Sequence, residues 1–161
     1  MDIKITKKDS FQYTGIVTIS LMQGNTTLKS VTVHNNGTLD FFHILCGAVI
    51  GNNVAYLMPK YLAVFDGTGR ELSLARPHYT TAVVENTNEA VFTFVIPGSF
   101  LSAGTVRHLQ LFNSSSLSAN VLAEVFLSEE AGVLTNTAAN LMIQWRMSFT
   151  NASTSDVGEL S

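Results

Sequence analysis

Residues 141–149 read LMIQWRMSF and alternate between two kinds of side chain. One set is wholly apolar or aromatic, and the other is mostly polar. The first set is Leu141, Ile143, Trp145, Met147 and Phe149, and the second is Met142, Gln144, Arg146 and Ser148. A period of two is typical of a strand that buries one face and leaves the other open. This stretch therefore predicts a core strand in a layered β-protein.

Segments of strand length, alternating or continuously apolar, recur along the rest of the chain. They cover residues 11–21, 28–34, 61–65, 79–84, 90–96, 106–112 and 121–127. The turn residues Gln23-Gly24-Asn25-Thr26 and Asn86-Thr87-Asn88 separate neighbouring runs and indicate two hairpins. About eight strands without a strand–helix–strand rhythm predict a mainly β protein. We expect an antiparallel β-sandwich of jelly-roll-like type.

Residues 39–50 (LDFFHILCGAVI) follow a different period, with apolar residues recurring at intervals of three and four. Thr38 is placed to cap the start of a helix, and Gly51 is placed to close it. A helix that is apolar on nearly all sides is normally buried. We therefore expect one short buried helix near residues 39–50, packed against a sheet edge or between sheets. The single cysteine, Cys46, should then be a buried and inert thiol.

The chain of 161 residues fits a single domain, and it shows neither a linker nor an internal repeat. We expect one domain over residues 1–161, with an N-terminal arm (1–10) and a C-terminal tail (150–161), because neither end carries a period. The longest apolar stretch is too short to cross a bilayer, and the first residues do not have the pattern of a signal peptide. Membrane insertion and secretion are not expected.

Charged residues are scarce, at 13% of the chain against about 25% in an average domain. The nine basic residues are scattered, so the concentrated basic stripe of a nucleic-acid-binding protein is missing from the sequence. A weakly charged surface lets subunits approach without a large desolvation penalty. The composition favours a surface that other proteins cover in the working state. A β-protein that is simply rich in Thr and Asn is the alternative reading.

The sequence shows no recognisable catalytic or metal-binding motif. The four histidines, His34, His43, His78 and His108, lack the spacing of a metal site. The Asp66-Gly67-Thr68-Gly69 stretch predicts a tight turn. Its single carboxylate is weak support for a Ca²⁺ site, because Ca²⁺ binds six to eight oxygen atoms. We expect no enzymatic activity, no catalytic or cofactor-binding residues, no cofactor and no small-molecule substrate.

An ordered set of four motifs resembles a family of small virion structural proteins of tailed bacteriophages. The motifs are PKYLAV with the DGTG turn (59–69), VRHLQLFN (106–113), VLAEV (121–125) and LMIQWRMSF (141–149), and the likeness spans residues 36 to 150. The chain departs from the family pattern in three places. Phe65-Asp66 replaces the small residue before the first turn glycine, His108 stands where relatives tend to have an acid, and Glu124 stands where they tend to have Arg. If that acid and that Arg pair in relatives, the pair here is altered and its charges can be reversed.

The resemblance implies a virion component, either associated with the tail or fibre or auxiliary to the capsid, assembled in the cytoplasm of a bacterial host. Its partners would be other copies of the chain and other virion proteins. We expect a subunit contact on the face of residues 141–149 that carries Met142, Gln144 and Arg146.

Two rival functions stay open at the level of sequence. A receptor- or carbohydrate-binding module of a phage tail tip would need an exposed aromatic platform, and Trp145 is the only Trp. A small hydrolase would need His108, Glu124 and a serine in one cleft.

Overall fold

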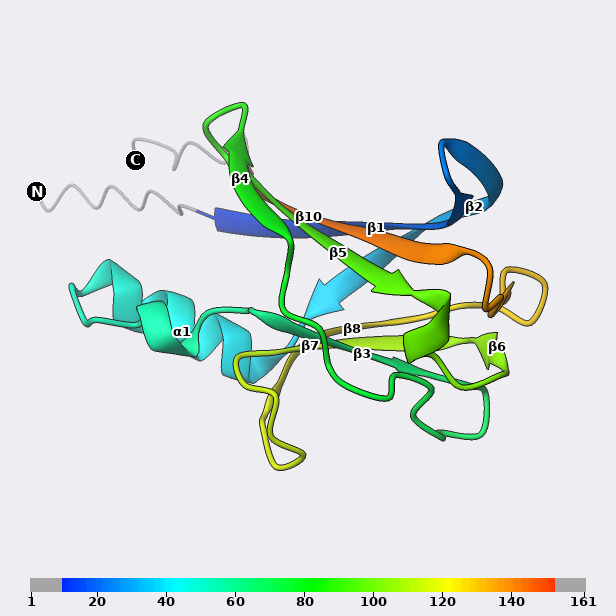
Figure 1. Ribbon diagram of the computed structural model, residues 1–161. Helices are drawn as coiled ribbons and strands as arrows, with labels where there is room; N and C mark the ends of the chain where they lie inside the picture. Colours follow the sequence, from blue (N-terminus) through cyan, green and yellow to red (C-terminus); the bar gives the residue numbers. More distant parts are fainter. Residues whose placement is uncertain (1–9, 153–161) are drawn as a thin grey trace, which may run out of the picture.

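Antiparallel strands dominate the computed structural model, which describes residues 10–152 (Figure 1). Strands make up 53% of the described residues, which also hold one α-helix. The elements are β1 (Ser10–Gln23), β2 (Thr26–Gly37), α1 (Leu39–Val49), η1 (Ala55–Leu57), β3 (Tyr61–Phe65), β4 (Thr81–Glu85), β5 (Glu89–Pro97), η2 (Gly98–Phe100), β6 (Thr105–Val106), β7 (His108–Phe112), β8 (Val121–Phe126), β9 (Val133–Leu134) and β10 (Asn140–Ala152). The prediction of a mainly β protein is confirmed.

Most strands belong to one eight-stranded sheet with the order β3-β7-β8-β2-β1-β10-β5-β4, and β6 pairs with β9 in a small second sheet. The large sheet bends back where β2 meets β8, through only two residue pairs, Asn36↔Glu124 and Gly37↔Ala123. The strands β3, β7 and β8 therefore form a layer beneath β1, β10 and β5 (Figure 1). Within residues 10–152 no pairing joins β3 to β4, so the sheet is open. The jelly-roll connectivity stays a prediction.

The core lies between these two layers, and β10 is the central strand of the layer formed by β2, β1, β10, β5 and β4. Leu141, Ile143 and Trp145 are fully buried, as the alternation predicted. The opposing layer contributes side chains that are also completely buried, namely Leu62, Val64, Leu109 and Leu111. Because each strand contributes alternate residues, the opposite faces of the strands lie on the outside of the molecule.

Both predicted hairpins are confirmed. β1 and β2 are joined at Gly24, which has a φ of +59°, and β4 and β5 are joined through Asn86 and Thr87, whose φ values are +51° and +65°. The predicted strand over residues 106–112 is split at Arg107, whose N–H donates to Phe65 O instead of continuing one ladder. Its first part, β6, pairs with β9, and its second part, β7, pairs with β3 and β8.

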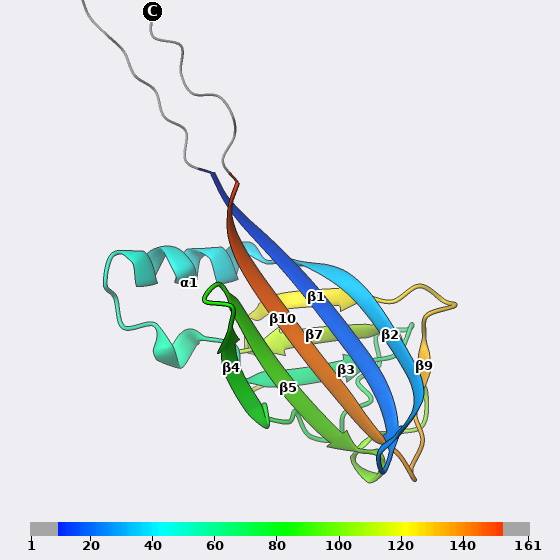
Figure 2. The same ribbon diagram turned by 90° about the horizontal axis from the view of Figure 1, so that it is seen from above.

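The helix forms where it was predicted, but the expectation that it is buried is wrong. Thr38 Oγ1 accepts a hydrogen bond from Phe41 N and donates to carbonyl oxygens of β8, which fixes the start of α1. From there the helix extends past the end of the lower layer (Figure 2). Phe41 and Ile44 are buried, whereas Val49 is 86% exposed and Cys46 is exposed. The expectation of a buried thiol is therefore also wrong.

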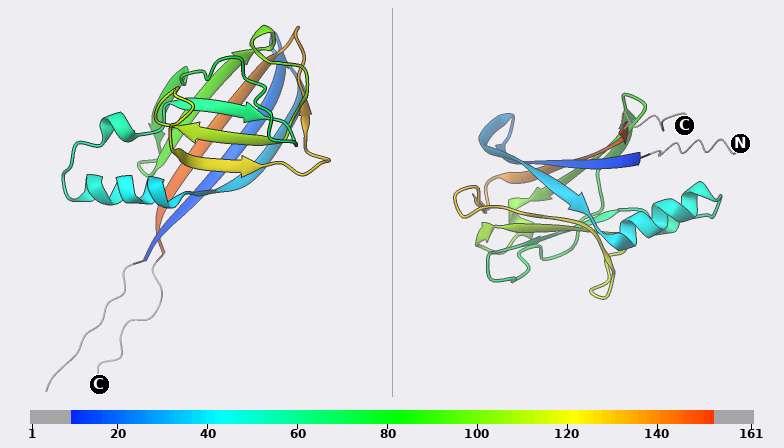
Figure 3. Two further views of the ribbon diagram at one scale, coloured as in Figure 1. Left: turned by 90° about the horizontal axis from the view of Figure 1, so that it is seen from below. Right: turned by 180° about the vertical axis from the view of Figure 1, so that it is seen from behind.

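The predicted arms fall mainly outside the described residues. Ser10 belongs to β1, and residues 150–152 belong to β10, with Ser10 paired to Ala152 at the end of the ladder. Two strands that are far apart in sequence thus lie side by side where the described chain begins and ends (Figure 3). Residues 1–9 and 153–161 lie outside the description.

Candidate interaction surfaces

An apolar groove lies between α1 and the beginning of β1. Its volume is about 830 Å³, and it is lined by Gln12, Tyr13, Gly37, Phe42, Leu45, Cys46 and Val49. The Tyr13 ring forms edge-to-face contacts with Phe41 and Phe42, at centroid distances of 6.0 and 5.8 Å, and these contacts hold the helix beside the strand. No lining residue carries a formal charge, so the groove suits an apolar occupant.

The exposed side of the helix extends this apolar character. Val49 and Ile50 are 86% and 77% exposed. We call the group Phe42, Leu45, Cys46, Val49 and Ile50 the α1 surface. Single exposed apolar residues are common on soluble proteins, but a contiguous group beside a groove is typical of an interaction site. Sequence reasoning missed this surface, because an all-apolar helix has the same pattern whether its own chain or a partner covers it.

The outer face of β10 carries the three residues that were predicted to line a subunit contact. Met142 and Arg146 are half-buried, and Gln144 is exposed. The row through Gln144 crosses five strands and is made of Thr32, Thr18, Gln144, Thr93 and Thr81. Along this row the face carries no charge, and its side chains can form hydrogen bonds. Its role as a contact stays a prediction.

Arg146 is the cation of this outer face, and two glutamates hold it. Its Nη1 lies 2.7 Å from Glu85 Oε2 and 2.6 Å from Glu89 Oε2. The hydrogen bond from Arg146 lowers the pKa of Glu89, and the two glutamates raise the pKa of the guanidinium. The cluster ties β10 to both strands of the β4–β5 hairpin and leaves one net negative charge there.

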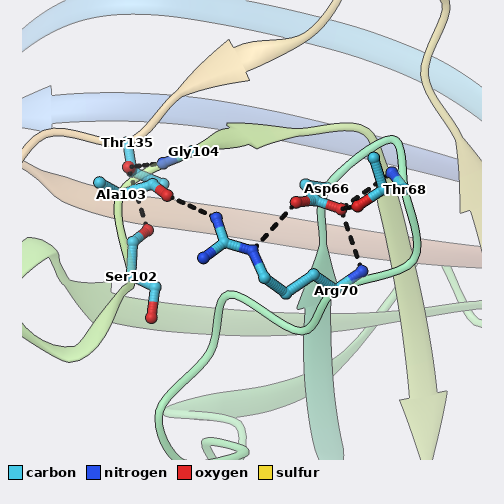
Figure 4. Close-up of polar contacts among 7 residues, drawn as sticks. All are labelled: Asp66, Thr68, Arg70, Ser102, Ala103, Gly104 and Thr135. Carbon is cyan, nitrogen blue, oxygen red and sulfur yellow. Dashed lines mark hydrogen bonds and ion pairs between the residues drawn. The ribbon is translucent and has the colours of Figure 1, made fainter.

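The Asp66 turn is held by its own chain (Figure 4). Asp66 Oδ1 accepts from Thr68 N, Thr68 Oγ1 and Arg70 N, and Oδ2 accepts from Arg70 Nε. These bonds, led by the Thr68 hydroxyl, hold the pKa of Asp66 well below its usual range. Arg70 also donates to Ala103 O at 2.8 Å. The carboxylate is engaged in closing the turn, as expected for a structural loop.

His108 and Glu124 meet on the outer face of the lower layer. His108 Nε2 lies 3.1 Å from Glu124 Oε2, which also accepts from Gln110 Nε2 at 3.2 Å. The imidazole stacks on Phe126 with a centroid distance of 4.0 Å. The two side chains that the sequence singled out as a possible altered pair are therefore in contact. Within residues 10–152 the His108 ring has no hydrogen bond to a serine, so the triad of a hydrolase is not assembled here.

The remaining predicted site features are placed as follows. Trp145 is fully buried and offers no platform to a sugar. His34, His43, His78 and His108 come from different elements, and the described part of the chain contains no group of three or more His, Cys, Asp or Glu residues able to hold a metal ion. None of the helices in the described part of the chain has the length and apolar character needed to span a membrane.

Comparison with protein-family models, with characterised proteins and with solved structures finds no match.

Proposed function

We propose that this chain is a non-enzymatic structural protein of a bacteriophage virion, with a β-sandwich of jelly-roll-like type that acts through contacts with copies of itself and with other virion proteins. The ordered motifs over residues 36–150 support the assignment to a virion. The charged fraction of 13% supports a surface that other subunits cover. The association with tail, fibre or capsid belongs to the same proposal.

The observation that carries the proposal is the α1 surface, which residues 10–152 leave exposed. A helix that keeps Val49 86% exposed and Ile50 77% exposed presents to water the side chains that a fold normally buries. We assign its cover to a second copy of the chain. The groove beside the helix is lined without charged residues and matches the apolar side chains that the same helix presents.

Light scattering coupled to size exclusion on the full chain tests the proposal. The wild type is expected to form an oligomer whose mass falls on dilution. The double variant Val49→Glu/Ile50→Glu is expected to shift the equilibrium toward the monomer, because an interface would have to bury two carboxylates without partners. Leu117→Glu is the matched control, since Leu117 is 83% exposed in a loop remote in sequence from α1. It should leave the mass unchanged.

A wild-type chain that stays monomeric at high concentration and binds no sibling virion protein would overturn the proposal. Equal dissociation by the α1 variant and the Leu117→Glu control would remove α1 as its basis. Circular dichroism on all three proteins separates lost assembly from lost folding.

A further inference from the structure

The strand β4 is an open edge of the large sheet. It pairs with β5 through Thr81↔Thr93 to Glu85↔Glu89, and in the described part of the chain no other strand pairs with it. All five of its residues are exposed, with Val83 at 48% and Val84 at 76%. An edge strand presents a row of backbone N–H and C=O groups that a further strand can use.

The opposite edge of the same sheet is handled differently. Residues 71–79 run along β3 and bond to it, through Leu72 N to Val64 O at 2.7 Å, Leu62 N to Pro77 O at 3.1 Å and Tyr79 N to Lys60 O at 3.0 Å. Thus β3 is covered by its own chain. None of the other described residues covers β4 in this way, and the strand itself contains no proline, lysine or bulge of the kind that blocks edge pairing.

We propose that β4 pairs with β4 of a second copy, antiparallel and with the two-fold axis at Val83, so that the two sheets become continuous. This rests on the proposed function, since it names one contact of the assembly. In this register Val83 faces Val83 of the second copy, Thr81 faces Glu85, and Ala82 faces Val84. All five residues find a partner, and each pair shares one face of the sheet.

Charge supports the same register. The only charged residue of β4, Glu85, faces a threonine hydroxyl rather than another carboxylate. Glu85 and Glu89 share Arg146, so the hairpin end of β4 keeps one net negative charge. Antiparallel pairing therefore keeps the two Glu85 carboxylates at opposite ends of the paired strands, so that like charges do not face each other.

Cysteine crosslinking tests the register in a Cys46→Ser background, because Cys46 is exposed. Directly opposite residues have Cβ atoms about 4.5–5.5 Å apart, near the span of a disulfide, whereas diagonal neighbours are about 7–8 Å apart. Val83→Cys lies on the axis, and Val84→Cys lies one position from it. Mild oxidation is expected to link Val83→Cys copies at least about tenfold faster than Val84→Cys copies. Equal rates would overturn the register.

A second variant tests the β4 contact by its effect on the dissociation constant, without a crosslink. Val83→Lys places a charge on the edge and is expected to raise the dissociation constant about tenfold or more. Leu28→Lys, at 45% exposure, is its control. If the wild type assembles but both β4 experiments show no effect, the edge proposal fails while the proposed function stands. If the wild type does not assemble with itself or with a virion sibling, both fail.

Discussion

Replacing Gly15 with alanine is expected to destabilise the fold by about 2–6 kcal/mol, although it adds one methyl group. Gly15 lies in the middle of β1, paired with Asn35 of β2 on one side and Met147 of β10 on the other. A Cβ at this position would overlap Asn35 Oδ1 and would lie 2.5 Å from Asn35 Cγ and 2.8 Å from Tyr13 Oη. The space that a side chain needs is occupied by a buried amide.

The magnitude is the sum of two effects. Overpacking a well-filled site costs about 1–3 kcal/mol through shifted side chains and backbone. Moving the Asn35 amide also breaks its hydrogen bond to Tyr13 Oη, at 3.5 Å, inside the fold. A buried polar group that loses its partner costs a further 1–3 kcal/mol or so. The neighbouring strands cannot relax independently, because β1 is bonded on both sides.

Urea unfolding followed by circular dichroism gives the free energies. Gly67→Ala is the control, because the nearest atom to its added Cβ is 3.5 Å away on a flexible arginine, and it should change stability by less than about 0.5 kcal/mol. Asn35→Ala removes the obstructing group, so the double variant should be less destabilised than the sum of the single variants. A Gly15→Ala protein within about 1 kcal/mol of the wild type, or strictly additive variants, would refute the reasoning.

Four further predictions follow from single sites. Burial raises the pKa of Tyr13 above its ordinary value of 10.0, against the opposing hydrogen bond from Asn35. The folded state therefore holds this proton more tightly, so the contribution of Tyr13 to stability should be constant below pH 10 and fall above it. Tyr13→Phe should flatten that alkaline slope in urea titrations, and an unchanged slope contradicts the assignment. The lowered pKa of Asp66 has the opposite sign: its contribution is present above about pH 4 and is lost as the pH falls, so Asp66→Asn should flatten the acid limb of the stability profile, and an unaltered limb argues against it. Thr38→Ala should cost about 1 kcal/mol by removing the cap of α1, with Thr38→Ser restoring most of it, and equal losses in both variants would assign the effect to packing. Ile143→Ala in the core should lower the free energy of unfolding by about 2–5 kcal/mol, whereas Arg146→Gln on the opposite face of β10 should lower it by less than about 1 kcal/mol. Thermal unfolding of both variants checks this order, and a larger loss for Arg146→Gln would contradict it.

The sheet could be predicted from the sequence because its strands alternate. In residues 141–149 every second residue is apolar, and the structure buries Leu141, Ile143 and Trp145 completely. The two hairpins were equally predictable, since Gly24 and Asn86 are residue types that tolerate a positive φ. Local sequence determines both features.

The environment of α1 could not be predicted in this way. The period of residues 39–50 and the cap at Thr38 fix the helix, but nothing local says where its axis points. Hydrogen bonds from Thr38 to β8 set the direction, and they join residues 83 and 84 positions apart. The exposure of Val49 and Cys46 follows from that long-range contact. The pairing of His108 with Glu124 likewise depends on the register between β7 and β8, which the local sequence does not determine.

The α1 surface and the edge strand β4 can contribute to assembly in different ways. Burying a valine or isoleucine side chain completely stabilises a complex by about 1.5–3 kcal/mol. With Val49 86% and Ile50 77% exposed, covering both is worth about 2.5–5 kcal/mol, which corresponds to a change of about two to three and a half orders of magnitude in affinity. Association of two proteins costs about 4–15 kcal/mol in lost freedom. When the pair is counted on both copies, the gain is about 5–10 kcal/mol, which covers the lower part of this cost but not the upper part.

A second contact would add to this gain, and β4 offers one of a different kind. Pairing at an edge adds directed backbone hydrogen bonds and fixes the relative orientation of two sheets, which apolar contact at a helix does not do. If both contacts operate, Val49→Glu/Ile50→Glu and Val83→Lys should each weaken assembly without abolishing it, and the triple variant should be a monomer. If either change alone gives a monomer at high concentration, one contact carries the assembly and the shared role argued for the α1 surface and β4 is wrong.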